Sequence, residues 1–103
     1  MLGTDFILDA LAAEGLDHLF MVPGGLVDPF LPALGRQSAI RPIVAAQEGG
    51  AAYMADGYAR ASGNFGAVLT IGGPGLGNTV TALQAARSDA SPVLLLSGEV
   101  ATA

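Results

Sequence analysis

Apolar and polar residues follow two periods along this chain, and these periods alternate from block to block. Apolar residues at helical spacing predict helices at 4–14, 48–61 and 79–88. Residues 26–35 are predicted to contain a short helix, and Pro29 and Pro32, which fit only in or near its first turn, leave its start open. Short apolar runs predict strands at 17–22, 40–46, 65–71 and 92–97. Strands 65–71 and 92–97 are unbroken apolar runs, which predicts that both of their faces are covered. Strict alternation of strand and helix favours an α/β fold: a doubly wound parallel sheet with helices on both faces.

The turns between these elements contain residues that begin or end helices. Thr4 is predicted to cap the first helix, and Gly15 is predicted to end it. The segment "GGPGLGNT", residues 72–79, allows a tight turn from strand to helix, with Asn78 as the predicted cap. We therefore interpret this glycine-rich segment first as a turn.

The unusual peptides of the chain all follow predicted strands. They are Pro23-Gly24-Gly25, Gln47-Glu48-Gly49-Gly50, the segment 72–78, and Gly98-Glu99. The carboxyl ends of parallel strands meet at one edge of the sheet, and ligands of open α/β sheets bind outside that edge. The sequence thus predicts a binding site where these four peptides come together.

Composition restricts the function further. Of 103 residues, 51% are hydrophobic and 13% are charged, so we expect some apolar surface to contact another chain or domain. The net charge is −5, with four scattered arginines and no lysine, which argues against nucleic acid as a partner. The absence of cysteine excludes disulfides and thiolate metal sites. We expect neither a signal peptide nor a membrane span, and hence a cytoplasmic protein.

Two nucleotide-binding motifs can be compared with the glycine-rich segment. Gly72 and Gly77 have the spacing of a phosphate-binding P-loop, but Asn78 occupies the position of its lysine. The dinucleotide spacing G-x-G-x-x-G also fails, because its sixth position falls on Asn78. A nucleotide-binding domain therefore stays only as a minor alternative.

Glu48 is the candidate for chemistry. An acidic residue in the first turn of a helix is favoured by roughly 0.3–1 kcal/mol through the helix dipole, and this structural explanation is open. The residues around it, "IVAAQEGGAA", are apolar or small, which suits a carboxyl group that shares a proton with a ligand. Gly49 and Gly50 cost up to about 1 kcal/mol each relative to alanine, so we interpret them as room for a flat ligand.

Three motifs together resemble one family. "QEGGAAYMADGYAR" is similar to the Glu-x-x-Ala-Ala-x-x-Ala-Asp-Gly-Tyr-Ala-Arg signature of thiamine-diphosphate enzymes. "FMVPGG" resembles the first strand and Pro-Gly turn of the family, and "TIGGPGLGN" resembles its Gly-Pro-Gly-x-x-Asn loop. The resemblance is to the N-terminal pyrimidine-binding domain of acetolactate synthases, pyruvate oxidases and benzoylformate decarboxylases. It covers nearly the whole chain.

This resemblance implies roles for particular residues. The glutamate that matches Glu48 activates the cofactor through a hydrogen bond to N1′ of its aminopyrimidine ring. The other residues whose positions match the cofactor-proximal motifs are Pro23, Gly24, Gly25, Gln47, Gly73, Pro74, Gly75 and Asn78. In the family, Mg²⁺ and the diphosphate are held by another domain, and we expect no metal site in this chain. Nothing in these motifs indicates FAD, which stays open.

The resemblance also implies an assembly. Residues 1–103 would be a partial or minimal pyrimidine-binding domain whose sheet is incomplete at the C-terminus. Its expected partners are a diphosphate-binding domain or subunit, a second copy in an oligomer of at least two chains, and a small 2-oxo acid. The chain alone is expected to be inactive.

Two positions leave the branch of the family open. Gln47 stands where many acetolactate synthases have histidine, and it matches benzoylformate decarboxylases instead. Gly25 is more similar to the ligase and oxidase branch. The expected reaction is decarboxylation of a 2-oxo acid followed by carboligation or protonation. The alternatives are a separate small subunit of a split enzyme and a non-catalytic binding module of the same fold.

Overall fold

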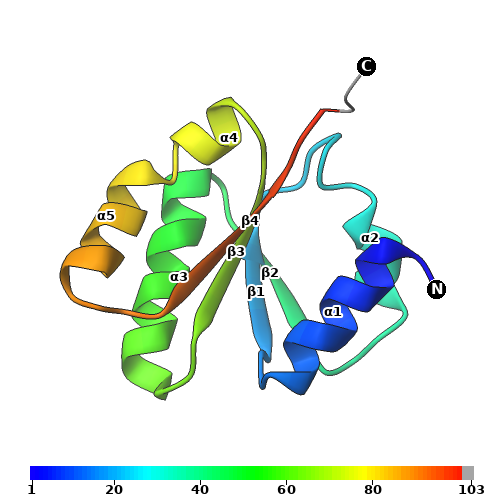
Figure 1. The fold of residues 1–103 in the computed structure, drawn as a ribbon. Helices are drawn as coiled ribbons and strands as arrows, with labels where there is room; N and C mark the ends of the chain where they lie inside the picture. Colours follow the sequence, from blue (N-terminus) through cyan, green and yellow to red (C-terminus); the bar gives the residue numbers. More distant parts are fainter. Residues whose placement is uncertain (101–103) are drawn as a thin grey trace.

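A computed structural model, in which residues 1–100 are described, shows a single four-stranded sheet in that part of the chain (Figure 1). All strand pairs are parallel, and the order across the sheet is β2-β1-β3-β4. The strands are β1 (His18–Met21), β2 (Arg41–Val44), β3 (Gly66–Ile71) and β4 (Val93–Gly98). The predicted α/β fold with a parallel sheet is confirmed.

Helices cover both faces of this sheet, as Figure 1 shows. The helices are α1 (Gly3–Ala13), α2 (Phe30–Gly35), α3 (Glu48–Ser62), α4 (Pro74–Gly77) and α5 (Val80–Ser88). Side chains alternate between two apolar clusters: Leu19 and Met21 pack in the cluster with α1 and α2, whereas Phe20 packs in the cluster with α3. This alternation is the period of a strand that is buried on both faces.

The direction of chain progression reverses between β1 and β3. From β1 the chain passes through α2 to β2, and it then returns through α3 across β1 to reach β3. In open α/β sheets such a reversal leaves a crevice at the carboxyl ends of the two strands, where ligands bind. The topology therefore places a candidate site outside the ends of β1 and β3.

Helix α3 lies very close to the sheet. Its inner face consists of small buried residues, among them Ala51, Ala55 and Ala59. A side-chain carbon added at Gly66, the first residue of β3, would overlap the carbonyl oxygen of Ala55. Glycine at this position is thus required for the observed contact between α3 and β3.

The first helix begins differently from the prediction. Thr4 lies inside α1, and its hydroxyl oxygen is buried with no hydrogen-bond partner among the described residues. The Asp5 carboxylate accepts a hydrogen bond from the backbone N–H of Leu2 at 3.2 Å and so caps the helix instead. Gly15 follows the helix with a φ of +98°, as expected of a helix stop.

Two further findings concern the edges of elements. The second helix, whose start the sequence leaves open, begins at Phe30, after a turn that includes Pro29. Strand β3 is buried as predicted, but β4 has only one neighbouring strand and its side chains are half-buried, with Leu94 36% exposed. The prediction that both faces are covered is therefore wrong for β4 within residues 1–100.

No helix in the described part of the chain has the length and apolar character needed to cross a membrane.

The α3–β3 contact can be tested by adding one methyl group. Gly66→Ala should lower the free energy of unfolding by about 1–3 kcal/mol, because the new carbon meets the backbone of Ala55. Gly57→Ala is the matched control, since Gly57 lies within α3 and has no atom within 4 Å of an added carbon. The control should raise stability by up to about 1 kcal/mol. Equal urea-unfolding midpoints for the two variants would contradict the close contact.

Candidate functional site at the carboxyl edge of the sheet

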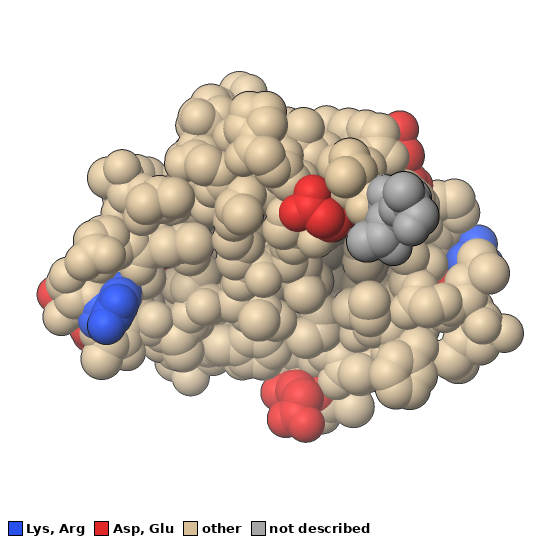
Figure 2. All heavy atoms as spheres, turned by 45° about the horizontal axis from the view of Figure 1, so that its top comes forward, with Lys and Arg blue, Asp and Glu red and all other residues tan. Residues whose placement is uncertain are grey.

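The predicted site residues do come together at the carboxyl edge, which lies at the top of Figure 1. The turn after β1 and the loop after β3 are neighbours, because Met21 pairs with Leu69 and Val22 N–H donates to the Leu69 carbonyl at 3.3 Å. Helix α3 begins at the same edge with Glu48. Figure 2, which brings this edge forward, shows isolated charged side chains on a largely uncharged surface.

Glu48 contacts a residue 30 positions further along the chain. Its side-chain oxygen Oε1 accepts a hydrogen bond from Nδ2 of Asn78 at 3.1 Å. Glu48 is half-buried, and Ala51 and Ala52 behind it are fully buried. The glutamate is therefore held at the edge by a specific partner and is more than a favourable charge at a helix start.

Gln47 caps the helix that carries Glu48. Its backbone is extended, and its Oε1 accepts a hydrogen bond from the backbone N–H of Gly50 at 3.1 Å. This contact satisfies one of the free N–H groups at the start of α3. The amide oxygen of Gln47 thus makes one hydrogen bond within the chain, and its amide nitrogen makes none among the described residues.

The two glycines after Glu48 differ in their surroundings. A carbon added at Gly49 would lie 2.8 Å from Oε1 of Gln47 and 3.0 Å from the carbonyl oxygen of Asn78. At Gly50 nothing lies within 4 Å. Gly49 is therefore explained by contacts inside the chain, whereas Gly50 leaves open space at the surface.

The glycines of the turn after β1 and of the loop after β3 also fall into two groups: some pack against the chain, and others have open space around them. Carbons added at Gly24 and Gly75 would lie 2.8 Å and 2.6 Å from the side chain of Ile71, so both glycines pack on that residue. Gly25 and Gly73 have no atom within 4 Å of an added carbon, and both are exposed. Pro23 and Pro74 are exposed as well. Together with Gly50, these four residues form an open part of the edge.

The glycine-rich segment folds into the short helix α4, which the sequence did not predict. Asn78 ends α4, and Thr79 begins α5 without a side-chain cap. The prediction that Asn78 caps the following helix is wrong, because its side chain bonds to Glu48 instead. The pairing also weakens the nucleotide alternative, since a carboxylate beside this loop repels phosphate.

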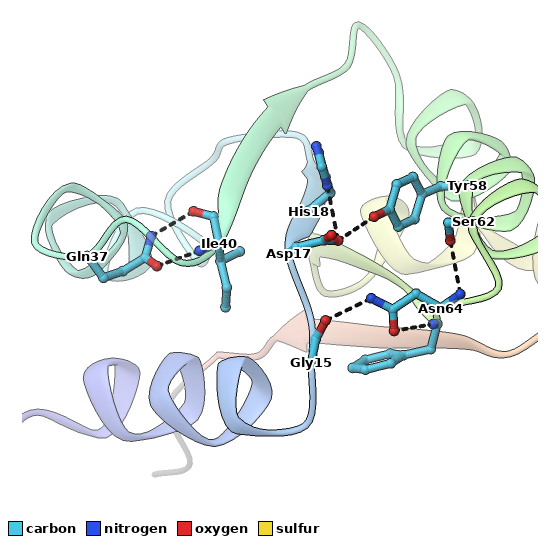
Figure 3. Close-up of polar contacts among 9 residues, drawn as sticks. Gly15, Asp17, His18, Gln37, Ile40, Tyr58, Ser62 and Asn64 are labelled. Atoms are coloured by element: carbon cyan, nitrogen blue, oxygen red, sulfur yellow. Dashed lines mark hydrogen bonds and ion pairs between the residues drawn. The ribbon is translucent and has the colours of Figure 1, made fainter.

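A second polar cluster lies at the opposite, amino edge of the sheet, drawn in Figure 3. Asp17 accepts hydrogen bonds from the Tyr58 hydroxyl and from Nδ1 of His18, the latter at 3.1 Å. The hydrogen bond from Tyr58 lowers the pKa of Asp17, and the same bond raises the pKa of Tyr58. His18 is half-buried. Sequence patterns did not indicate this cluster, because its members belong to different elements.

Side-chain hydrogen bonds fasten several loops at the amino edge. Asn64 donates to the Gly15 carbonyl at 2.7 Å, and Gln37 both donates to and accepts from the backbone of Ile40 at 2.7 Å (Figure 3). At the carboxyl edge, the Glu48–Asn78 bond joins segments that follow different strands. A rigid scaffold with open loops at one end is the usual arrangement of a binding site.

Another charged residue at this edge is Glu99, which follows β4; a carbon added at Gly72 would lie 2.9 Å from its Oε1. A hollow of about 250 Å³ lies against α1 and α2, but none of the predicted site residues lines it. Its Arg36 is paired with Asp5 at 2.8 Å. Within residues 1–100, no group of three or more His, Cys, Asp or Glu side chains is placed to hold a metal ion.

Comparison with known proteins identifies the family. Residues 1–103 match the family described as "Thiamine pyrophosphate enzyme, N-terminal TPP binding domain". This chain belongs to that family. The family resemblance predicted from the three motifs is confirmed.

Relatives of this thiamine pyrophosphate enzyme domain are acetolactate synthase subunits. A probable acetolactate synthase large subunit of Methanocaldococcus jannaschii is 43% identical over 102 residues, which is 99% of this chain and 17% of the relative. The acetolactate synthase isozyme 3 large subunit of Escherichia coli is 38% identical over 100 residues, covering 97% of this chain and 17% of the relative. The chain thus spans less than a fifth of these relatives.

The amino-edge cluster predicts how stability depends on pH. Because the folded-state pKa of Asp17 is lowered, its bond to Tyr58 stabilises the fold fully above pH 3.8, and the contribution is lost as pH falls through the lowered pKa. Because the pKa of Tyr58 is raised, the contribution is also lost as pH rises above 10 through the raised value. Tyr58→Phe should therefore lower the unfolding temperature at pH 7, and the deficit should shrink towards both extremes.

Tyr53→Phe is the matched control, because Tyr53 is exposed on the same helix and its hydroxyl has no hydrogen-bond partner among the described residues. Its unfolding temperature should follow that of the unmodified protein at every pH. A Tyr58→Phe deficit that stays constant from pH 3 to pH 11 would show that the carboxylate–hydroxyl pair is not its cause.

Proposed function

We propose that this domain supplies the pyrimidine-binding half of a thiamine-diphosphate site in an acetolactate synthase-like enzyme that acts on 2-oxo acids. The observation that carries the proposal is the position of Glu48. It stands at the carboxyl edge beside the strand-order reversal, held by Asn78 from the loop after β3. Family membership and the names of the relatives support the same cofactor and reaction class.

The residues at this edge fit an aminopyrimidine ring. A ring nitrogen of this kind pairs with a carboxyl group, and Glu48 offers one: Oε1 accepts from Asn78, while the other oxygen has no hydrogen-bond partner among residues 1–100. Gly25 and Gly73 are exposed and open, so a flat group can approach their backbone. The donor set and the open backbone thus agree with the cofactor.

In this proposal Glu48 holds and exchanges a proton at the pyrimidine nitrogen. Glu48 is half-buried, and its carboxyl group lies at the start of α3 beside the loop after β3. Thiamine diphosphate, when bound, supplies a carbon nucleophile for the carbonyl group of a 2-oxo acid and takes up the charge left by decarboxylation. Pro23, Gly25, Gly73 and Pro74 would form the exposed surface against the ring, whereas Gly24 and Gly75 shape the loops from beneath.

The remaining half of the site would come from another domain or subunit. Mg²⁺ and the diphosphate would be bound there, and at least two chains would assemble around the cofactor. The relatives favour carboligation as the second step, because acetolactate synthase is the activity in their names. The cytoplasmic location stays a prediction.

Glu48→Gln tests the proposed proton transfer in the complete assembly. The C2 proton of bound thiamine diphosphate should exchange with deuterated water about 10²- to 10⁴-fold more slowly, because the amide cannot exchange the proton. Glu14→Gln, an exposed glutamate at the end of α1, is the matched control and should exchange at the unmodified rate. Near-normal exchange in Glu48→Gln, with the cofactor bound, would overturn the role of Glu48.

The assembly itself is tested by the intact mass of the native protein and its co-purifying partners under denaturing conditions. The proposal expects either one species well above the 10.2 kDa of this chain or a second polypeptide beside it. The first result identifies one longer enzyme and the second a split enzyme. A 10.2 kDa species alone that binds no thiamine diphosphate would favour the non-catalytic module.

A further inference from the structure

Asn78 connects the loop after β3 directly to the proposed catalytic carboxyl group. We propose that Asn78 is a positioning residue, which orients the Glu48 side chain and leaves one carboxylate oxygen free for the pyrimidine nitrogen. This inference rests on the proposed function of Glu48. It assigns to Asn78 a role that differs from the direct contact with the cofactor expected from the motif.

The backbone around Asn78 is held firmly. Its N–H donates to the Pro74 carbonyl at 3.0 Å, and the next residue, Thr79, is fully buried. The Thr79 hydroxyl donates to the Leu76 carbonyl at 2.7 Å. These hydrogen bonds fix the backbone of Asn78 at the α4–α5 junction, and they thereby limit where its side-chain amide can lie.

The first residues of α3 leave room for the α4–α5 junction to pack against them. The carbonyl oxygen of Asn78 would lie only 3.0 Å from a carbon added at Gly49, so a larger residue there would separate the two segments. The Gln47 side chain accepts a hydrogen bond from the backbone N–H of Gly50, so the side chain that bonds to Glu48 is that of Asn78. Glycine at position 49 thus allows the α4–α5 junction to approach the start of α3 this closely.

The chemistry of the amide suits a positioning role. An asparagine amide donates a hydrogen bond but does not titrate, so it orients a carboxylate without competing for the proton. A lysine at this position, as in a P-loop, would hold the carboxylate in its charged form much more strongly. A neutral donor therefore orients the Glu48 carboxyl group without placing a charge beside it.

Solution NMR of the protein without cofactor tests the contact itself. The side-chain amide protons of Asn78 should exchange with solvent more slowly than those of Gln84, an exposed glutamine on α5. Glu48→Ala should abolish that difference, because the acceptor is removed. Equal exchange at Asn78 and Gln84 in the unmodified protein would overturn the inference.

Kinetics in the complete assembly test the consequence. Asn78→Ala should slow C2 proton exchange about ten- to hundredfold through loss of orientation. It should change the dissociation constant of thiamine diphosphate less than about threefold. In a Glu48→Ala background the same substitution should have almost no effect on exchange, since coupled residues are not additive. Gln84→Ala, the matched amide control, should match the unmodified enzyme.

A conservative change gives a second readout. Asn78→Asp keeps the shape but places a carboxylate beside Glu48, so the acid limb of the pH–rate profile should move to higher pH. Asn78→Ala should lower the rate without this displacement. An unmoved acid limb in Asn78→Asp would overturn the positioning role.

The outcomes separate this inference from the proposed function. If Glu48→Gln stops exchange while Asn78→Ala leaves it unchanged, the inference fails and the proposed function stands. If Asn78→Ala weakens cofactor binding equally with and without the Glu48 side chain, Asn78 contacts the cofactor directly and the inference fails. If the unmodified assembly binds no thiamine diphosphate, both fail.

Discussion

The close contact between α3 and the sheet determines where the functional groups of this domain lie. Small residues on the inner face of α3 and Gly66 at the start of β3 allow helix and sheet backbones to approach until a single added carbon would overlap Ala55. Because a helix is stiff along its axis, this contact in its middle also places its first residue. Glu48 is thereby brought to the carboxyl edge, next to the loop after β3.

The glycines of the motifs serve two physical purposes. Gly24, Gly49 and Gly75 lie against neighbouring atoms of the chain and allow its loops to pack closely. Gly25 and Gly73 lie open at the surface, where the backbone itself can meet a ligand. The first group allows the loops to pack into the edge, and the second leaves their backbone exposed there. Gly73 also has a φ of +64°, a backbone conformation that favours glycine whatever lies nearby.

The amino and carboxyl edges of the sheet also differ in how firmly their loops are held. At the amino edge, Asp17, His18 and Tyr58 join β1 to α3, and further side chains fasten the loops. At the carboxyl edge the Glu48–Asn78 bond brings together the start of α3 and the loop after β3. A domain that is tightly fastened at one end and open at the other can hold a reactive group in a fixed direction. In the proposed function that group is the carboxyl group of Glu48.

Much of this arrangement could be predicted from local patterns. The periods of apolar residues predicted the strands, the order of motifs predicted the family, and the rule for parallel strands predicted that Glu48 and the glycine loops share an edge. The main exception is a contact between segments far apart in sequence, because nothing local indicates that Asn78 bonds to Glu48 rather than capping α5. A smaller exception is local: Asp5, three residues after Leu2, caps α1, whereas the neighbouring Thr4 was predicted to do so.

A crystal structure of the complete assembly with thiamine diphosphate would test the central claim most directly. The account predicts one carboxylate oxygen of Glu48 about 2.6–3.2 Å from a pyrimidine ring nitrogen, with the other still accepting from Asn78. A pyrimidine ring bound away from Glu48, or a Glu48 side chain turned away from both, would contradict it.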